Sequence, residues 1–135
     1  MSFAAPVLTL LLLGQPAVDD DPKVNDPRLQ LQLFAAAPDI VTPVGIAVDD
    51  KGRVLCIESN THFPPADYQG HKTDRIRMFE DTNGDGKADK CITFYDKLHC
   101  PVGFEFWNGG VLVVDQPRII FLKDTNGDDK ADVVE

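Results

Sequence analysis

The sequence is poor in basic residues and has no segment in which they concentrate. Its 13 Lys and Arg residues compare with 22 Asp and Glu residues, which gives a formal net charge of −9 at pH 7. A surface this acidic repels phosphate backbones, so the composition argues against nucleic-acid binding. Such an excess of carboxylates favours bound cations as partners instead.

A long apolar run is also absent. The longest one, residues 4–13, is shorter than the roughly 20 residues of a transmembrane helix but has the length of a signal-peptide hydrophobic region. No Lys or Arg precedes it, and Gln15-Pro16-Ala17 follows it in place of a small-x-small cleavage pattern. We predict a signal peptide at residues 1–18, an acidic linker at 19–27 and export to the periplasm or the cell exterior. A buried strand or helix is the alternative for the apolar run.

Several catalytic and cofactor motifs are missing. The sequence contains no Cys-x-x-Cys-His haem attachment motif, no Gly-x-Ser-x-Gly elbow, no phosphate-binding loop and no dinucleotide fingerprint. It has three cysteines, an odd number that cannot pair completely within one chain. Cys56 is predicted to behave as a small core residue, whereas Cys91 and Cys100 are the pair that could form a disulfide in an exported protein.

The sequence does contain an internal repeat. Residues 81–89 (DTNGDGKAD, loop 1) recur 43 residues later as residues 124–132 (DTNGDDKAD, loop 2), with eight of nine positions identical. The single difference is Gly86 against Asp129. A four-stranded propeller blade has a period of about this length.

Short apolar runs separated by turn residues surround both loops. They predict strands at residues 29–34, 44–48, 53–57, 75–79 and 91–95, and then at 101–106, 111–114 and 118–122. Glycine-containing turns are expected at 49–52 and 108–110. We therefore predict an all-β fold, an incomplete β-propeller of about two four-stranded antiparallel blades. Blade one would span residues 28–95 and blade two 96–135, the latter without its closing strand. We expect the remaining blades to belong to a longer protein, with a self-associating pair or trimer as the alternative.

The two Asp-rich loops resemble cation-binding turns. Oxygen ligands at alternating positions allow a tight loop to wrap a hard cation, as in the calcium loop of an EF-hand. We predict structural Ca²⁺ sites in both loops, with these ligands: Asp81, Asn83, Asp85, Lys87 through its carbonyl, and Asp89 in loop 1; Asp124, Asn126, Asp128, Lys130, Asp132 and Glu135 in loop 2.

An alternative without metal is a turn in which Asp and Asn side chains cap their own backbone amides. Ile92 stands at position 12 of loop 1, where an EF-hand has a bidentate carboxylate, and Asp129 stands at position 6 of loop 2, where glycine is usual. Neither loop has the helical flanks of an EF-hand. Four clustered acceptors without a cation would, however, repel one another.

An insertion of 15 residues distinguishes the first unit from the second. It falls between Glu58 and Asp74 and gathers acids, bases and aromatic residues in a loop at the rim of the blade. His62, His71 and Asp74 are the candidate catalytic or metal-binding residues there. The alternative is a solvated polar loop, since no fixed metal-ligand spacing is present.

Residues 43–55 (PVGIAVDDKGRVL) resemble the first-blade motif of glucose/sorbosone dehydrogenase-like β-propellers. The continuation through residues 58–65 (ESNTHFPP) and 74–76 (DRI) is similar to one branch, the large exported planctomycete-type proteins described as membrane-bound dehydrogenases. The resemblance covers roughly residues 27–135. It implies a six-bladed propeller, often followed by helical repeats and a c-type haem domain.

The resemblance also implies PQQ as cofactor and a sugar as substrate in complete members. Soluble quinoprotein sugar dehydrogenases carry a catalytic histidine directly after the proline that starts the strand, whereas this sequence has Val44 and Val102 there. We therefore expect a part of an oxidoreductase-like propeller that is inactive alone. The alternative is a calcium-stabilised carbohydrate- or protein-binding module that uses its inserted loop.

Overall fold

The computed structural model describes residues 22–135, and the predicted signal peptide lies outside this range. The chain divides into two compact units, one ending at Leu31 and the other comprising residues 32–135. In the described part of the first unit, Asp26 accepts hydrogen bonds from the backbone and the guanidinium of Arg28. Within residues 22–135, no helix is long and apolar enough to cross a membrane.

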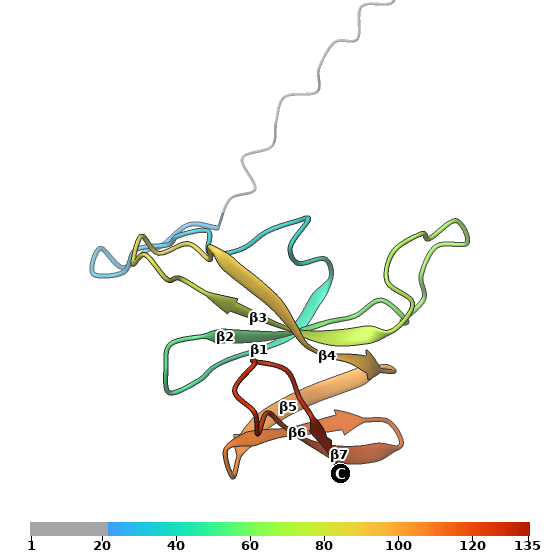
Figure 1. Cartoon of the computed structure of the whole chain (residues 1–135). Helices are drawn as coiled ribbons and strands as arrows, with labels where there is room; N and C mark the ends of the chain where they lie inside the picture. Colours follow the sequence, from blue (N-terminus) through green and yellow to red (C-terminus); the bar gives the residue numbers. More distant parts are fainter. Residues whose placement is uncertain (1–21) are drawn as a thin grey trace, which may run out of the picture. The chain divides into compact units, whose positions relative to one another are not determined.

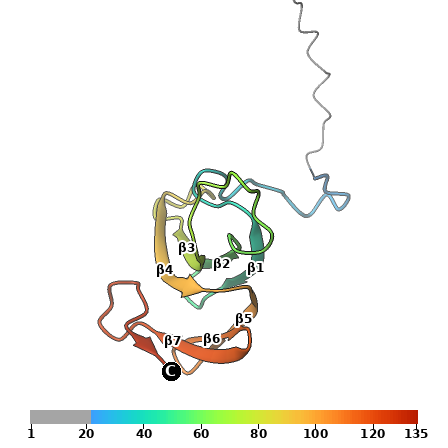
Figure 2. The ribbon, with the colours of Figure 1, turned by 90° about the vertical axis from the view of Figure 1, so that its right-hand side faces the viewer.

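The second unit contains two four-stranded sheets (Figures 1 and 2). The first sheet has the order β1 (Pro43–Val48), β2 (Val54–Glu58), β3 (Asp74–Glu80) and β4 (Lys90–Leu98). The second has the order β5 (Pro101–Trp107), β6 (Gly110–Asp115), β7 (Arg118–Lys123) and β8 (Val133–Val134). All neighbouring strands are antiparallel. The all-β fold of two propeller-like blades is thereby confirmed.

The repeat extends from the loops into the strand register. Ile46 pairs with Cys56 in the first sheet, and Phe104 pairs with Val113 at the equivalent place in the second. The register shifts at the start of β1 and again at the start of β5. The residue before each strand, Thr42 or Cys100, has a positive φ of 54° or 50°. The two blades thus share local backbone geometry that the sequence match alone does not reveal.

The hydrophobic core lies between the two sheets. One face of each sheet contributes to it, because side chains two apart along a strand point to the same side. Its buried members are Leu55, Ile57, Ile76, Met78, Phe94 and Leu98 from the first sheet, and Val111, Val113, Ile120 and Leu122 from the second.

The strand predicted at residues 29–34 does not form, so that prediction is wrong. The side chains of Leu29, Leu31 and Leu33 are 66%, 55% and 70% exposed. The alternation of apolar and polar residues is typical of a strand, but a strand also needs a hydrogen-bonding neighbour. Residues 43–134 provide all eight strands of both sheets, and each pairs within its own sheet.

The expected lack of a closing strand in blade two is also wrong. After loop 2, β8 pairs with β7, and Glu135 exchanges backbone hydrogen bonds with Phe121. Loop 2 reverses the chain in the same way as loop 1, so the residues after it return along β7.

Cys91 and Cys100, the pair that could have formed a disulfide, are free thiols, and so is Cys56. Cys91 is near the start of β4, and Cys100 lies just beyond its end. An extended strand rises about 3.3 Å per residue, so the two are separated by roughly 30 Å, far more than the about 7 Å limit between the Cα atoms of a disulfide. Cys56 is buried, as predicted for a core residue, and burial raises the pKa of its thiol to about 11.

Candidate functional site

Loop 1 forms the turn from β3 to β4, and Asp81 organises it. Its carboxylate accepts the backbone N–H groups of Gly84 and Gly86, both at 2.7 Å, and that of Asp85 at 3.2 Å. The two glycines have φ values of 78° and 84°, which are costly for other residues. The bond from the Gly86 amide is the main cause that lowers the pKa of Asp81 below its ordinary value.

The remaining polar residues of loop 1 bond to their own turn. Asn83 accepts the N–H of Asp85 at 2.9 Å, and Asp85 in turn accepts the N–H of Lys87 at 2.9 Å. Asp89 closes the loop by accepting the backbone N–H and the hydroxyl of Thr82. The loop is therefore a set of side-chain caps on backbone amides, which is the geometry of the alternative without metal.

Loop 2 repeats this geometry. Asp124 accepts the N–H groups of Gly127 at 2.7 Å and of Asp129 at 2.9 Å. Asp132 accepts hydrogen bonds from the backbone N–H and from the hydroxyl of Thr125. The hydroxyl of Thr125 is the main cause that lowers the pKa of Asp132. Asn126 and Asp128 accept the N–H groups of Asp128 and Lys130.

The donor set of each loop can be compared with the needs of calcium. Within residues 22–135 no three His, Cys, Asp or Glu side chains gather as a metal-binding group, so a cation would also need amide, carbonyl or water oxygens. Position 12 of each loop lies beyond the turn: Ile92 is within β4, and the backbone of Glu135 hydrogen-bonds to that of Phe121. The residues are those that calcium prefers. Asp81 and Asp124 each use one carboxylate oxygen for two amide bonds and the other oxygen for one, so each of these two carboxylates keeps a lone pair on one oxygen.

Asp129, the one position at which the loops differ, joins loop 2 to the first sheet. It adopts a φ of 64°, the conformation that glycine provides in loop 1. Its carboxylate pairs with Arg53 at 2.5 Å and with Lys90 at 3.0 Å. The bond from Lys90 is the main cause that lowers the pKa of Asp129.

Arg53 is held for this contact by the turn between β1 and β2. The carboxylate of Asp49 accepts the backbone N–H of Lys51 and that of Arg53, and it also pairs with the Arg53 Nε at 2.7 Å. Sequence reasoning did not identify Arg53 or Lys90 as site residues. The only signal was the difference between Gly86 and Asp129, which shows neither partner.

Asp74, a candidate catalytic residue, is completely buried and fully bonded. It accepts hydrogen bonds from the backbone amides of Asn60, Thr61 and Cys100 and from the Thr61 hydroxyl. Burial by itself would raise the pKa of Asp74, but these bonds outweigh it and hold the pKa below its ordinary value. Its place is structural, at the junction of the inserted loop with the start of β5.

The two candidate histidines have separate partners. His62 is exposed and contacts the Phe63 ring edge to face, with ring centroids 4.6 Å apart. The Nδ1 of His71 lies 2.8 Å from the carbonyl of Thr73. His71 lines a shallow cavity with Tyr68 and His99, but His62 and Asp74 do not. The structure therefore does not join the three candidates into one acid–base site.

Each blade has a buried carboxylate at the end of its second strand, and neither was predicted as a site residue. Glu58, at the end of β2, pairs with Arg75 and accepts the N–H of Val41. Asp115, at the end of β6, pairs with Arg118 and accepts the N–H of His99. Burial would raise the pKa of Glu58, but the bond from Arg75 and then that from Val41 lower it below its ordinary value.

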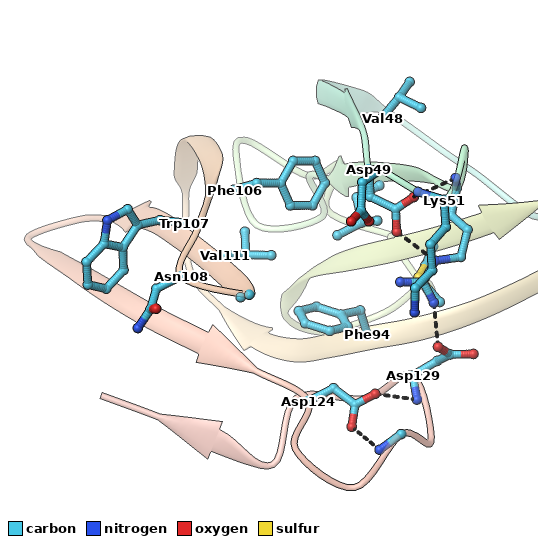
Figure 3. A pocket seen from close by; sticks show the side chains of 17 residues that line it. Val48, Asp49, Lys51, Phe94, Phe106, Trp107, Asn108, Val111, Asp124 and Asp129 are labelled. Atoms are coloured by element: carbon cyan, nitrogen blue, oxygen red, sulfur yellow. Dashed lines mark hydrogen bonds and ion pairs between the residues drawn. The ribbon is translucent and has the colours of Figure 1, made fainter.

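A cavity of about 590 Å³ opens between the sheets beside loop 2 (Figure 3). Its lining includes Phe94 and Phe106, whose rings Figure 3 shows pointing into the opening. Asp50 and Asn108, from the turns after β1 and β5, are among the polar residues that line it. The arrangement combines apolar faces with hydrogen-bonding groups, as small-molecule sites do.

The residues do not fit the catalytic pattern that PQQ dependence would require. Val44 and Val102 are apolar side chains, 51% and 61% exposed, and each stands directly after the proline that starts its strand, where the resemblance to quinoprotein sugar dehydrogenases would lead us to expect a catalytic histidine. A valine can neither take up a proton nor coordinate a cofactor atom, and no step through PQQ follows for this chain.

Comparison with known protein families gives a match over most of the chain. The model of a family described as a domain of unknown function (DUF7133) matches residues 24–135. No curated protein and no solved structure matches.

Proposed function

The chain belongs to the DUF7133 family, and from that premise we propose that it supplies two adjacent blades of an exported, sugar-dehydrogenase-like β-propeller whose Asp loops are calcium-stabilised turns. The proposed role is architectural, and the chain has no catalytic activity alone. Val44 and Val102 support this part of the proposal, since neither can replace a catalytic histidine.

One backbone contact that occurs at both loops supports the interpretation of the two sheets as adjacent blades. The N–H of Ala131, in loop 2, donates to the carbonyl of Phe94 in β4, the last strand of the preceding sheet, at 2.9 Å. The N–H of Ala88, at the same position of loop 1, donates to the carbonyl of Phe34, also at 2.9 Å. The segment at Phe34 thus contacts blade one as the last strand of blade one contacts blade two. This is the regularity expected of a repeat array.

The chemistry of the loops supports calcium. Asp81, Asp85 and Asp89 place three carboxylates within one turn of nine residues, with only Lys87 as an opposite charge in the turn. Like charges this close repel one another unless a cation or protons neutralise them. A hard cation with flexible geometry is the partner that oxygen donors of this kind bind.

Calcium titration of the metal-free chain tests the proposal. We expect saturable heat in calorimetry and a higher Tm by circular dichroism, because binding to the folded state alone stabilises by about 2.7 kcal/mol per site at 100 times Kd. The double variant D85N/D128N should lose most of this shift. Asparagine can still accept the amide bond of each turn, so the variant removes charge and ligation and keeps the cap.

D67N, which removes an exposed acid of the inserted loop, is the matched control and should respond like the unchanged protein. Mg²⁺ should give a smaller shift, since it demands rigid octahedral geometry and retains its waters. If calcium produced no heat and no change of Tm, the loops would be self-capped turns without metal.

A second candidate function, carbohydrate or protein binding, is favoured by the cavity beside loop 2. The aromatic rings of its lining are suited to the apolar face of a sugar. Asp50 and Asn108, which also line it, are suited to hydrogen bonds with sugar hydroxyl groups. Calorimetry of the calcium-treated chain with monosaccharides and oligosaccharides distinguishes this candidate, since a purely architectural module gives no heat.

A further inference from the structure

A second cavity, of about 360 Å³, is lined by the inserted loop and by His99 of the connection between β4 and β5. Its volume is at the lower end of the roughly 300–1,000 Å³ range of small-molecule sites. The titratable side chains that line it are Tyr68, His71, Lys72 and His99. None of the Asp and Glu residues of the described chain lines it, although the protein has a net charge of −9. We call it the inserted-loop cavity.

Asp74 holds the two walls of this cavity together. Its buried carboxylate accepts the backbone N–H groups of Asn60 and Thr61 in the inserted loop and that of Cys100 in the β4–β5 connection. Within the loop, the hydroxyl of Tyr68 donates to the Asn60 side chain at 2.7 Å. The walls are therefore joined by hydrogen bonds to the backbone, and the carboxylate that joins them is directed at amides and does not line the cavity.

Lys72 provides a positive charge that forms no ion pair within residues 22–135. Its ammonium donates to the carbonyl of Tyr68 at 3.2 Å and lies 5.7 Å from the centroid of the Tyr68 ring. These contacts leave the ammonium two further N–H donors. A charged donor without a counter-ion is suited to an anionic group such as a carboxylate.

The two histidines of the inserted-loop cavity offer one acceptor and one donor in their neutral forms. The Nδ1 of His71 is 2.8 Å from the carbonyl of Thr73, closer than to the hydroxyl or the amide of Thr73 at 3.2 and 3.3 Å. A carbonyl only accepts, so Nδ1 carries the hydrogen and Nε2 can accept from a hydroxyl. The ring of His99 has no hydrogen-bond partner within residues 22–135, so either of its nitrogens is free to donate.

We propose that the inserted-loop cavity binds a sugar that carries a carboxylate. The carboxylate pairs with Lys72 and accepts from His99, and a hydroxyl of the sugar donates to Nε2 of His71. Pro64 and Pro65, which also line the cavity, offer an apolar surface to the C–H groups of the sugar ring. This site goes beyond the proposed function, because it uses neither the Asp loops nor the cavity beside loop 2.

NMR titration of the isotope-labelled full chain with glucuronate tests the proposal. We expect saturable shifts in the inserted loop and at His99, and an affinity for glucose about 10-fold lower, because glucose lacks the charge. K72Q should reduce the affinity for glucuronate about 10-fold and remove most of the preference over glucose. K97Q, which removes an exposed charge of β4, is the matched control and should bind like the unchanged protein.

H71N tests the hydroxyl contact separately. The asparagine amide can replace the Nδ1–H donor to Thr73 but has no counterpart of Nε2. We expect glucuronate to bind about 3-fold more weakly or worse, while its preference over glucose is retained because Lys72 is unchanged. An unchanged affinity of H71N for glucuronate would overturn the role of His71. Circular dichroism verifies that each variant is folded.

The proposal is overturned if glucuronate causes no saturable shifts in the inserted loop. It is also overturned if inorganic phosphate binds as tightly as glucuronate, since that would show a simple anion site. Shifts confined to residues around the cavity beside loop 2, such as Phe106 and Trp107, would contradict it and support the second candidate function instead.

The proposed function fails by a different measurement. The calcium response of Tm is measured on the unchanged protein and on K72Q, and we expect it to be the same in both. Loss of glucuronate binding with the calcium response intact contradicts only this inference, whereas absence of the calcium response with glucuronate binding intact contradicts only the calcium loops.

Discussion

Asp129 shows how one residue can combine a backbone role with a contact across sheets. Its position in the turn needs a positive φ, which Asp tolerates better than most residues other than glycine. Its carboxylate then bonds to Arg53 and Lys90 of the first sheet. Gly86 has the same backbone conformation but cannot make such a contact, so the two loops differ in attachment while they share a turn.

The coupling between Asp129 and Arg53 can be measured by a double-mutant cycle. We expect D129N and R53Q each to destabilise the fold and the pair to show a coupling free energy of about 0.5–1 kcal/mol, since the ion pair is only partly buried. Asparagine is the appropriate substitution because it also tolerates positive φ.

Urea unfolding of the four proteins gives the coupling, and high salt should reduce it. D50N, at an exposed carboxylate of the neighbouring turn, provides the control and should show no coupling with R53Q. Additive effects of D129N and R53Q would mean that the contact contributes nothing to stability.

At the scale of elements, the Asp loop is a turn that its sequence specifies almost completely. The side-chain caps involve residues two to seven positions apart, and the pattern is the same in both loops. Gly127 has a φ of 81°, and a Cβ placed on it would meet nothing within 4 Å. The requirement for glycine there is purely conformational.

Substitution of Gly127 isolates this conformational cost. We expect G127A to lower the free energy of unfolding by about 1–2 kcal/mol, the cost of a left-handed L-residue. G103A is the matched control, because a Cβ on Gly103 in β5 also meets nothing within 4 Å, and no positive φ is involved. Equal effects of the two substitutions, measured by urea unfolding, would contradict the conformational explanation.

The strand β4 shows where element-level reasoning was incomplete. The sequence predicted a strand at residues 91–95, and the structure extends it over Lys90–Leu98. That extension carries Cys100 away from Cys91 and rules out the disulfide between them. Strand length depends on pairing with β3, which continues to Asp74 and Leu98 and is not visible in a five-residue window.

At the scale of the whole molecule, the buried carboxylates connect stability to pH. The pKa values of Glu58 and Asp74 lie below their ordinary values in the folded state, so folding favours their ionised forms. Their contribution is present above the unfolded pKa values of about 4.3 and 3.9 and is lost as pH falls through the lower folded values.

We therefore expect the free energy of unfolding to change little with pH near neutrality and to fall below about pH 4. D74N should be less stable at pH 7 and should show a shallower loss of stability toward pH 2, because one of the linked carboxylates is gone. Urea midpoints at pH 7 and pH 3 measure both effects. D67N should retain the full pH dependence, and an unchanged slope in D74N would show that Asp74 is not linked to acid unfolding.

Local patterns were sufficient for the fold class because the relevant interactions are short in sequence. The 43-residue repeat, the alternation of apolar residues and the turns at residues 49–52 and 108–110 predicted two antiparallel blades, and the structure confirms them and adds the closing strand of blade two that was not expected. The same reasoning failed for residues 29–34, where alternation was present and a neighbouring strand was not. The calcium ligands stay a prediction, since the loop residues are compatible with a cation and also cap their own amides.

The sequence by itself determined the repeat, the polar loops and the all-β fold, because caps, turns and side-chain alternation act between residues a few positions apart. Only the tertiary structure decided the fate of the candidate site residues. Asp74 became a buried cap for the start of β5, and Asp129 became a link to Arg53 across 76 positions of sequence. Such contacts depend on how the sheets pack, and no local pattern encodes which distant residue arrives at a given carboxylate.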